Sequence, residues 1–124
     1  MNERPLVVAI ACTDLLQRAK IRAAVERHGA RSLALGAGTL TVPLGVDGMV
    51  ADLQDPRIDV PSLLANFTSE FPMISVLCFA PHVDAELLAL GRARATVTVT
   101  RSKLERALGV WLAALGPREP QSIA

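Results

Sequence analysis

Apolar residues fall into short continuous runs at three places along this chain: residues 6–11 (LVVAIA), 48–53 (GMVADL) and 72–79 (PMISVLCF). Runs without polar alternation are typical of strands buried on both faces of a parallel sheet. Residues 32–35 predict a further short strand. Residues 96–100 (TVTVT) alternate with period two, which indicates a strand with one polar face or a position at the sheet edge. The pattern predicts five strands.

Amphipathic segments follow most of these strands and predict helices at residues 15–28, 61–69, 85–94 and 102–115. In the first segment Ile21 and Val25 share one face, and Thr13 or Asp14 can cap its start. Strands that alternate with helices over short connections are typical of an α/β doubly wound domain. We therefore expect a flavodoxin-like, five-stranded parallel sheet in the order 2-1-3-4-5, with helices on both faces.

The length of 124 residues fits one domain, which we place at residues 1–116, followed by a disordered tail at 117–124. The 13 basic and 12 acidic side chains nearly balance, which argues against a nucleic-acid or membrane-surface binder. No apolar run is long enough for a membrane-spanning helix. We expect no nucleic-acid or membrane partner.

Cys12 and Cys78 are the two cysteines of the sequence. Their number and spacing form neither a disulfide framework nor a zinc motif, so we expect a reducing, cytoplasmic compartment. In the predicted strand order the first and fourth strands are separated by the third, which is too far for a disulfide. The sequence also offers no dinucleotide fingerprint and no clustered metal ligands, so we expect no cofactor and no metal.

Ligands of open α/β sheets bind at the carboxyl ends of the strands. Polar and reactive residues that follow the predicted strands therefore define a candidate rim pocket. Its members are Cys12, Thr13, Asp14, Ala80, His82 and Arg101, with Asp52 at the end of the third strand.

Three stretches resemble the receiver domain of bacterial two-component response regulators: MVADL (residues 49–53), PMISVLCFAPHVDAELL (72–88) and TVTVTRSKLERAL (96–108). The resemblance extends over about residues 4–115. It implies that Asp52 occupies the position of the phosphoacceptor aspartate. It also implies that the second helix is short or missing, since residues 29–52 are too few for the usual second strand, second helix and third strand.

The departures from the receiver pattern concern the residues that handle phosphate. Receivers carry two acidic residues after the first strand to hold Mg²⁺, whereas this chain has Cys12 and Thr13, with Asp14 one residue late. Ala80 stands where receivers have a switch Thr or Ser, and Arg101 replaces the usual Lys. A hard divalent ion would lose most of its ligand charge here.

Several alternatives stay open for the rim residues. Asp52 is either a phosphoacceptor with Arg101 as cationic partner, or an acid that is simply paired with Arg101. The Cys12-x5-Arg18 spacing occurs in low-molecular-weight tyrosine phosphatases, but a buried thiol beside an ordinary helix fits the residues between them better. His82 is either a metal ligand or base, or a loop residue that caps the next helix or contacts a partner.

Basic and apolar residues also gather on the last two helices and the fifth strand. In receivers this face forms homodimers or docks effectors. The candidate partner face comprises Arg92, Arg94, Val99, Lys103, Arg106 and Val110, joined by Leu112 if that residue is exposed.

We expect a stand-alone, atypical receiver-like domain that is not an enzyme and signals through a protein partner or as a homodimer, without the standard Mg²⁺-dependent aspartyl phosphorylation. The alternatives are a phosphorylatable single-domain response regulator that uses Asp52, and a small-molecule-binding flavodoxin-like domain that uses the rim pocket.

Overall fold

The computed structural model describes residues 4–115 of the chain. Residue 116 and the predicted tail at 117–124 lie outside the described residues. The described part forms a five-stranded sheet whose paired strands are all parallel, in the order β2-β1-β3-β4-β5, as predicted. The strands are β1 (Val7–Ala11), β2 (Arg31–Ala34), β3 (Gly48–Asp52), β4 (Ser75–Ala80) and β5 (Val97–Thr100).

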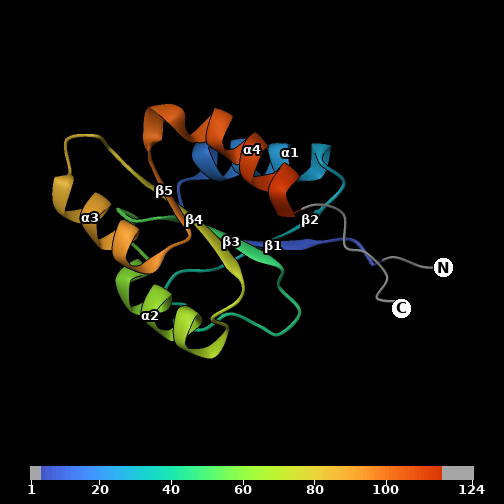
Figure 1. Cartoon of the computed structure of the whole chain (residues 1–124), viewed down its shortest axis with the longest axis horizontal. Helices are drawn as coiled ribbons and strands as arrows, with labels where there is room; N and C mark the ends of the chain where they lie inside the picture. The colour runs from blue at the N-terminus through green and yellow to red at the C-terminus, as the bar shows by residue number, and fades with distance from the viewer. Residues whose placement is uncertain (1–3, 116–124) are drawn as a thin grey trace.

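The helices form one layer on each side of the sheet (Figure 1). One layer holds α1 (Leu15–Arg27) and α4 (Leu104–Leu115), and the other holds α2 (Val60–Glu70) and α3 (Ala85–Arg94). Aspartates cap three of these helices: Asp14, Asp59 and Asp84 each accept a hydrogen bond from the backbone N–H three residues ahead. Of the two predicted caps of the first helix, Asp14 is the one used.

Two predicted boundaries are wrong by up to three residues. The fourth strand begins at Ser75 and not at residue 72, because residues 72–74 form a turn closed by a hydrogen bond from the Ile74 N–H to the Phe71 carbonyl. The last helix begins at Leu104 and not at residue 102, because η1 (Arg101–Lys103) is a tighter 3-10 turn.

The second helix of the usual pattern is missing, as predicted. Residues 35–47 connect β2 to β3 without a helix, and this connection buries Leu35, Val42 and Val46 in the layer that also holds α2. The side-chain amide of Asn66 on α2 donates a 2.8 Å hydrogen bond to the Leu40 carbonyl. These three aliphatic side chains and the hydrogen-bonded connection cover the face of the sheet where a helix would otherwise lie.

The continuous apolar strands feed two separate clusters, one on each face of the sheet. Along β1, Ala9 and Ala11 face the cluster under α2 and α3, whereas Val8 and Ile10 face the cluster under α1 and α4. Successive side chains of a strand point to opposite faces of the sheet, and a layer of helices covers each face. A buried strand therefore needs apolar residues at every position. No helix within residues 4–115 is long and apolar enough to cross a membrane.

Candidate functional site

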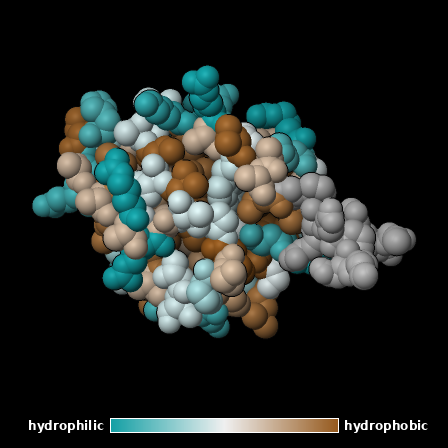
Figure 2. Space-filling model, in the orientation of Figure 1, coloured by the Kyte–Doolittle hydropathy of each residue, from teal (hydrophilic) through white to brown (hydrophobic). Residues whose placement is uncertain are grey.

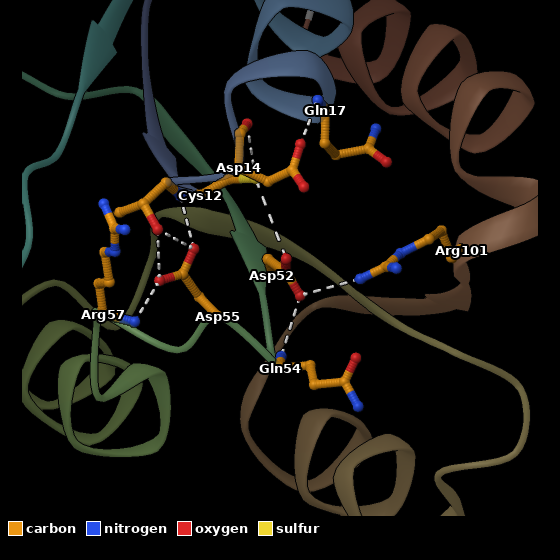
Figure 3. Close-up of polar contacts among 9 residues, drawn as sticks. Cys12, Asp14, Gln17, Asp52, Gln54, Asp55, Arg57 and Arg101 are labelled. Carbon is orange, nitrogen blue, oxygen red and sulfur yellow. Dashed lines mark hydrogen bonds and ion pairs between the residues drawn. The ribbon is translucent and has the colours of Figure 1, made fainter.

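The carboxyl ends of β1 and β3 meet the start of η1 at the sheet edge that the sequence predicts to hold the site. Asp52, the last residue of β3, is only 4% exposed. Its Oδ1 accepts a 2.9 Å hydrogen bond from the Gln54 N–H and lies 3.6 Å from Nη2 of Arg101 (Figure 3). The Arg101 guanidinium also lies over the Phe79 ring, 5.8 Å from its centre. The predicted ion pair between Asp52 and Arg101 is present.

The electrostatics of Asp52 follow from its depth. Burial raises the pKa of the Asp52 carboxyl above its ordinary value, because the charged form is removed from water. The Gln54 N–H and the Arg101 guanidinium act in the opposite direction but do not compensate fully. Arg101 is 44% exposed at its side chain, so part of its attraction is screened by solvent.

Cys12 lies directly beside Asp52. Its Sγ is 4.0 Å from Asp52 Oδ2 and 3.9 Å from the Asp14 carbonyl oxygen. Burial, followed by the charge of Asp52, raises the pKa of the Cys12 thiol to about 12. The thiol is therefore protonated at neutral pH and is a poor nucleophile. Arg18 lies within α1, four residues into a regular helix, and not on a phosphate-binding loop.

Thr13 stands at the second position of the expected acidic pair. It donates hydrogen bonds to a carboxylate from another loop. Its backbone N–H and its hydroxyl both donate to Asp55, the hydroxyl at 3.0 Å from either carboxylate oxygen. Asp55 also accepts from the N–H groups of Arg57 and Ile58, at 2.9 and 3.0 Å. Although burial raises the pKa of Asp55, these hydrogen bonds bring it below its ordinary value. Asp55 ties the β1–α1 loop to the β3–α2 loop.

Asp55 is the residue that the sequence analysis missed at this site. The Asp55-Pro56 pair indicates a turn, and a carboxylate that accepts from backbone N–H groups two and three residues ahead is an ordinary turn feature. That signal predicts the local turn. It does not predict that the same carboxylate reaches across to Thr13.

The third predicted residue of this loop, Asp14, directs its carboxylate at the start of α1. Its Oδ1 accepts a 2.9 Å hydrogen bond from the Gln17 N–H, and Figure 3 shows it pointing toward that helix. Asp14 also lines a hollow of about 220 Å³ beside Asp52, together with Leu16, Gln17, Lys20 and Arg101. It is a helix cap at the border of the site.

Receiver folds imply a magnesium ion, and Cys12, Asp52 and Asp55 bring three potential ligand atoms within 4.8 Å of one another. The donor chemistry does not fit Mg²⁺, which prefers oxygen ligands and a near-ideal octahedral shell. Cys12 offers a protonated sulfur, Asp55 already accepts hydrogen bonds from four donor groups, and Asp52 faces Arg101.

Two other rim residues lie apart from this cluster. Ala80 is fully buried at the end of β4, where it is the register partner of Thr100 on β5. His82 is exposed on the β4–α3 loop, and within residues 4–115 no hydrogen bond or ion pair joins it to Asp52 or Arg101. Asp84, and not His82, caps α3.

The predicted partner face has mixed exposure. Val110 is 68% exposed, whereas Leu112 is 1% exposed and belongs to the cluster under α1 and α4. Val99 is half-buried. The four basic residues of this face, Arg92, Arg94, Lys103 and Arg106, are exposed. Figure 2 shows hydrophobic side chains on the visible face as separate patches among polar ones, with no single continuous apolar area.

Comparison with known proteins identifies the fold. No protein-family model matches the chain, and no curated protein has a significantly similar sequence. Among solved structures, a response regulator receiver domain from Clostridium thermocellum is 12% identical with a TM-score of 0.73, covering 89% of this chain and 93% of that one.

Two further solved structures agree. A CheY-like receiver domain from Methanospirillum hungatei is 14% identical with a TM-score of 0.71, covering 90% of this chain and 97% of that one. The receiver domain of a Francisella response regulator is 19% identical with a TM-score of 0.70, covering 92% and 96%. Identities this low establish the fold alone. The chain therefore has the fold of a response-regulator receiver domain.

Proposed function

We propose that this chain is an atypical receiver-like signalling domain, not an enzyme, which acts by binding protein without the Mg²⁺-dependent phosphorylation cycle. The observation that carries the proposal is the replacement of the acidic pair. Cys12 contributes a protonated thiol, and Thr13 is held by Asp55. An aspartyl phosphate at Asp52 would lack the metal that offsets its charge in other receivers.

The arrangement around Asp52 supports the interpretation of an ion pair over that of a phosphoacceptor. The carboxylate is 4% exposed and faces Arg101, the Gln54 N–H and the Cys12 thiol. Ala80 supplies no hydroxyl to bind a phosphoryl oxygen. Residual phosphorylation of Asp52 is the second candidate function. It is favoured by the ion pair with Arg101, because this pair places a positive charge beside the carboxylate that would accept the phosphoryl group.

The experiment is the intact mass of the protein after incubation with acetyl phosphate, with and without Mg²⁺, for the wild type and Asp52→Asn. We expect no added phosphoryl mass under any of these conditions. A gain of one phosphoryl group in the wild type that Asp52→Asn lacks would replace this proposal with the phosphorylatable regulator. Acetylation is distinguished from phosphorylation by its different mass.

The partner is proposed to contact α3, β5 and α4. Exposed cations on this face and the exposed Val110 support a contact with a partly acidic surface or with a second copy of the chain. Sedimentation of the wild type and of Val110→Glu tests self-association. Leu44→Glu is the matched control, because Leu44 is 82% exposed on the connection between β2 and β3. A dimer that Val110→Glu dissociates and Leu44→Glu preserves supports this face, whereas equal effects of both variants exclude it.

Cys12 and Cys78 are both free and buried, which supports the predicted reducing, cytoplasmic compartment.

A further inference from the structure

Cys12, Asp52 and Asp55 form a buried cluster of potential metal ligands. Cys12 directly follows β1, Asp52 ends β3, and Asp55 lies in the loop after β3. One ligand atom from each of these side chains lies within 4.8 Å of the other two, and all three residues are buried. The cluster therefore offers one sulfur and two carboxylate oxygens to a single point in the interior.

One oxygen of this cluster has only a weak partner. Asp52 Oδ1 accepts from the Gln54 N–H and faces Arg101. Within residues 4–115, the hydrogen-bond partner of Asp52 Oδ2 is the Cys12 thiol, 4.0 Å away, which is long even for this weak donor (Figure 3). The Asp52 side chain is 5% exposed, so bulk water barely reaches it. A buried carboxylate oxygen with so weak a partner favours a cation between Asp52 and Cys12.

The charges of the cluster favour a divalent cation. While the Cys12 thiol is protonated, the carboxylates of Asp52 and Asp55 carry one negative charge more than Arg101 offsets. A divalent ion that also converts the thiol to a thiolate changes this sum. The two charges of the ion and the one of Arg101 then balance the three anions of the cluster.

We propose that Cys12, Asp52 and Asp55 bind a zinc ion. Zinc takes thiolate and carboxylate ligands in a four-coordinate shell, whereas Mg²⁺ requires oxygen ligands in an octahedral one. One oxygen from each carboxylate is then sufficient, and a water molecule completes the shell. The N–H groups of Arg57 and Ile58 keep their hydrogen bonds to Asp55, because carboxylates that bind metals commonly accept hydrogen bonds as well. The donors that suit Mg²⁺ poorly thus suit zinc.

Binding requires a small movement and the loss of one proton. Tetrahedral zinc, with bonds of about 2.3 Å to sulfur and about 2.0 Å to oxygen, holds these two ligand atoms roughly 3.5 Å apart. The Cys12 sulfur and Asp52 Oδ2 are 4.0 Å apart, so they need to close by about half an ångström. The S–H bond of Cys12 breaks, its electron pair forms the bond to zinc, and the proton passes to water.

The inference goes beyond the proposed function, since the zinc ligands and the partner face use different residues. The partner face lies on α3, β5 and α4, and the three ligands lie at the ends of β1 and β3 and in the loop after β3. Zinc binding and protein binding can therefore fail separately.

The test is a titration of the reduced, metal-free chain with Zn²⁺, Mg²⁺ and Co²⁺. Co²⁺ reports on the ligands, because a bond from cobalt to a thiolate gives an ultraviolet charge-transfer band. We expect one zinc ion per chain, bound at least about a hundredfold more tightly than Mg²⁺, since a thiolate ligand selects zinc over hard ions. We also expect the thiolate band with Co²⁺ and the release of about one proton per zinc ion.

Matched cysteine variants locate the ion. Cys12→Ala should weaken zinc binding at least about tenfold and remove the thiolate band of Co²⁺. Cys78→Ala should change neither, because Cys78 is also free and buried but lies on β4 in the cluster on the opposite face of the sheet. Asp52→Asn should also weaken binding at least about tenfold. Denaturant unfolding of each variant shows whether a loss of binding reflects a loss of fold.

The inference is overturned if the chain binds no zinc at micromolar concentrations, if Mg²⁺ binds as tightly as Zn²⁺, or if Cys12→Ala and Cys78→Ala lose binding equally. Zinc binding without a thiolate band for Co²⁺ also overturns it, and assigns the ion to exposed groups such as His28 or His82. These outcomes leave the acetyl phosphate experiment unaffected, so the proposed function is tested separately.

Discussion

The Thr13 backbone N–H and hydroxyl both donate to the carboxylate of Asp55, which lies 42 positions further along the chain. Through this contact the loop after β1 and the loop after β3 are held by one buried side chain. Thr13 thus joins two loops at the edge of the sheet that holds Asp52. The contact therefore stabilises this edge of the sheet.

This contact predicts that Asp55→Asn lowers the free energy of unfolding at pH 7 by about 1–3 kcal/mol, because an amide replaces a charged acceptor and leaves buried donors poorly paired. Denaturant unfolding followed by the fluorescence of Trp111 measures the effect. Asp59→Asn is the control: Asp59 is an exposed helix cap that Asn replaces well, so we expect a change within about 0.5 kcal/mol. Equal losses in the two variants would contradict the role given to Asp55.

The pH dependence of the same variant has a defined sign. Hydrogen bonds hold the pKa of Asp55 below its ordinary value in the folded chain. Asp55 therefore contributes stability that is complete above its unfolded pKa of about 3.9 and is lost as the pH falls through the folded value. Asp55→Asn should unfold with a weaker dependence on pH below about 4 than the wild type. Thermal unfolding across the acidic range measures this difference.

The stability that Asp52 contributes depends on pH in the opposite direction. Burial raises its pKa in the folded chain, so the stability it contributes is complete below the unfolded pKa and is lost as the pH rises through the folded pKa. Asp52→Asn removes the buried charge, and we expect it to raise the free energy of unfolding at neutral pH by about 0.5–2 kcal/mol. Destabilisation of that size at neutral pH would mean that the Arg101 ion pair outweighs the cost of burial.

The fold is predictable from the sequence because strands buried on both sheet faces consist of continuous apolar residues, as in β1 and β3. The meeting of Asp52 with Arg101 is also predictable, since parallel strands end at one edge. The Asp55–Thr13 contact is not, because it depends on the path of an irregular loop.

The connection between β2 and β3 gives a fourth prediction. Val42 is 6% exposed and Leu44 is 82% exposed within the same segment. If this segment covers the sheet in place of a helix, Val42→Ala should cost about 1–3 kcal/mol of unfolding free energy, since it deletes two buried methyl groups and leaves a gap. Leu44→Ala should change it by less than about 0.5 kcal/mol. Similar values for both variants would mean that the segment does not pack as described.

Gly48 and Trp111 give the last prediction. A Cβ on Gly48 would lie 2.8 Å from Cη2 of Trp111, and the Trp111 Nε1–H donates a 2.8 Å hydrogen bond to Ser75 Oγ. Gly48→Ala should therefore displace the indole, break that hydrogen bond and destabilise the chain by about 1–3 kcal/mol. Because Trp111 is the single tryptophan, its emission should shift to longer wavelength as the ring moves toward water.

The control lies in the same helix as Trp111. Gly109→Ala adds a Cβ with no heavy atom within 4 Å and replaces a helix-interior glycine, so it should stabilise the chain by about 0.5–1 kcal/mol without changing the emission. If Gly48→Ala left both the stability and the emission unchanged, α4 would be free to move away from the sheet.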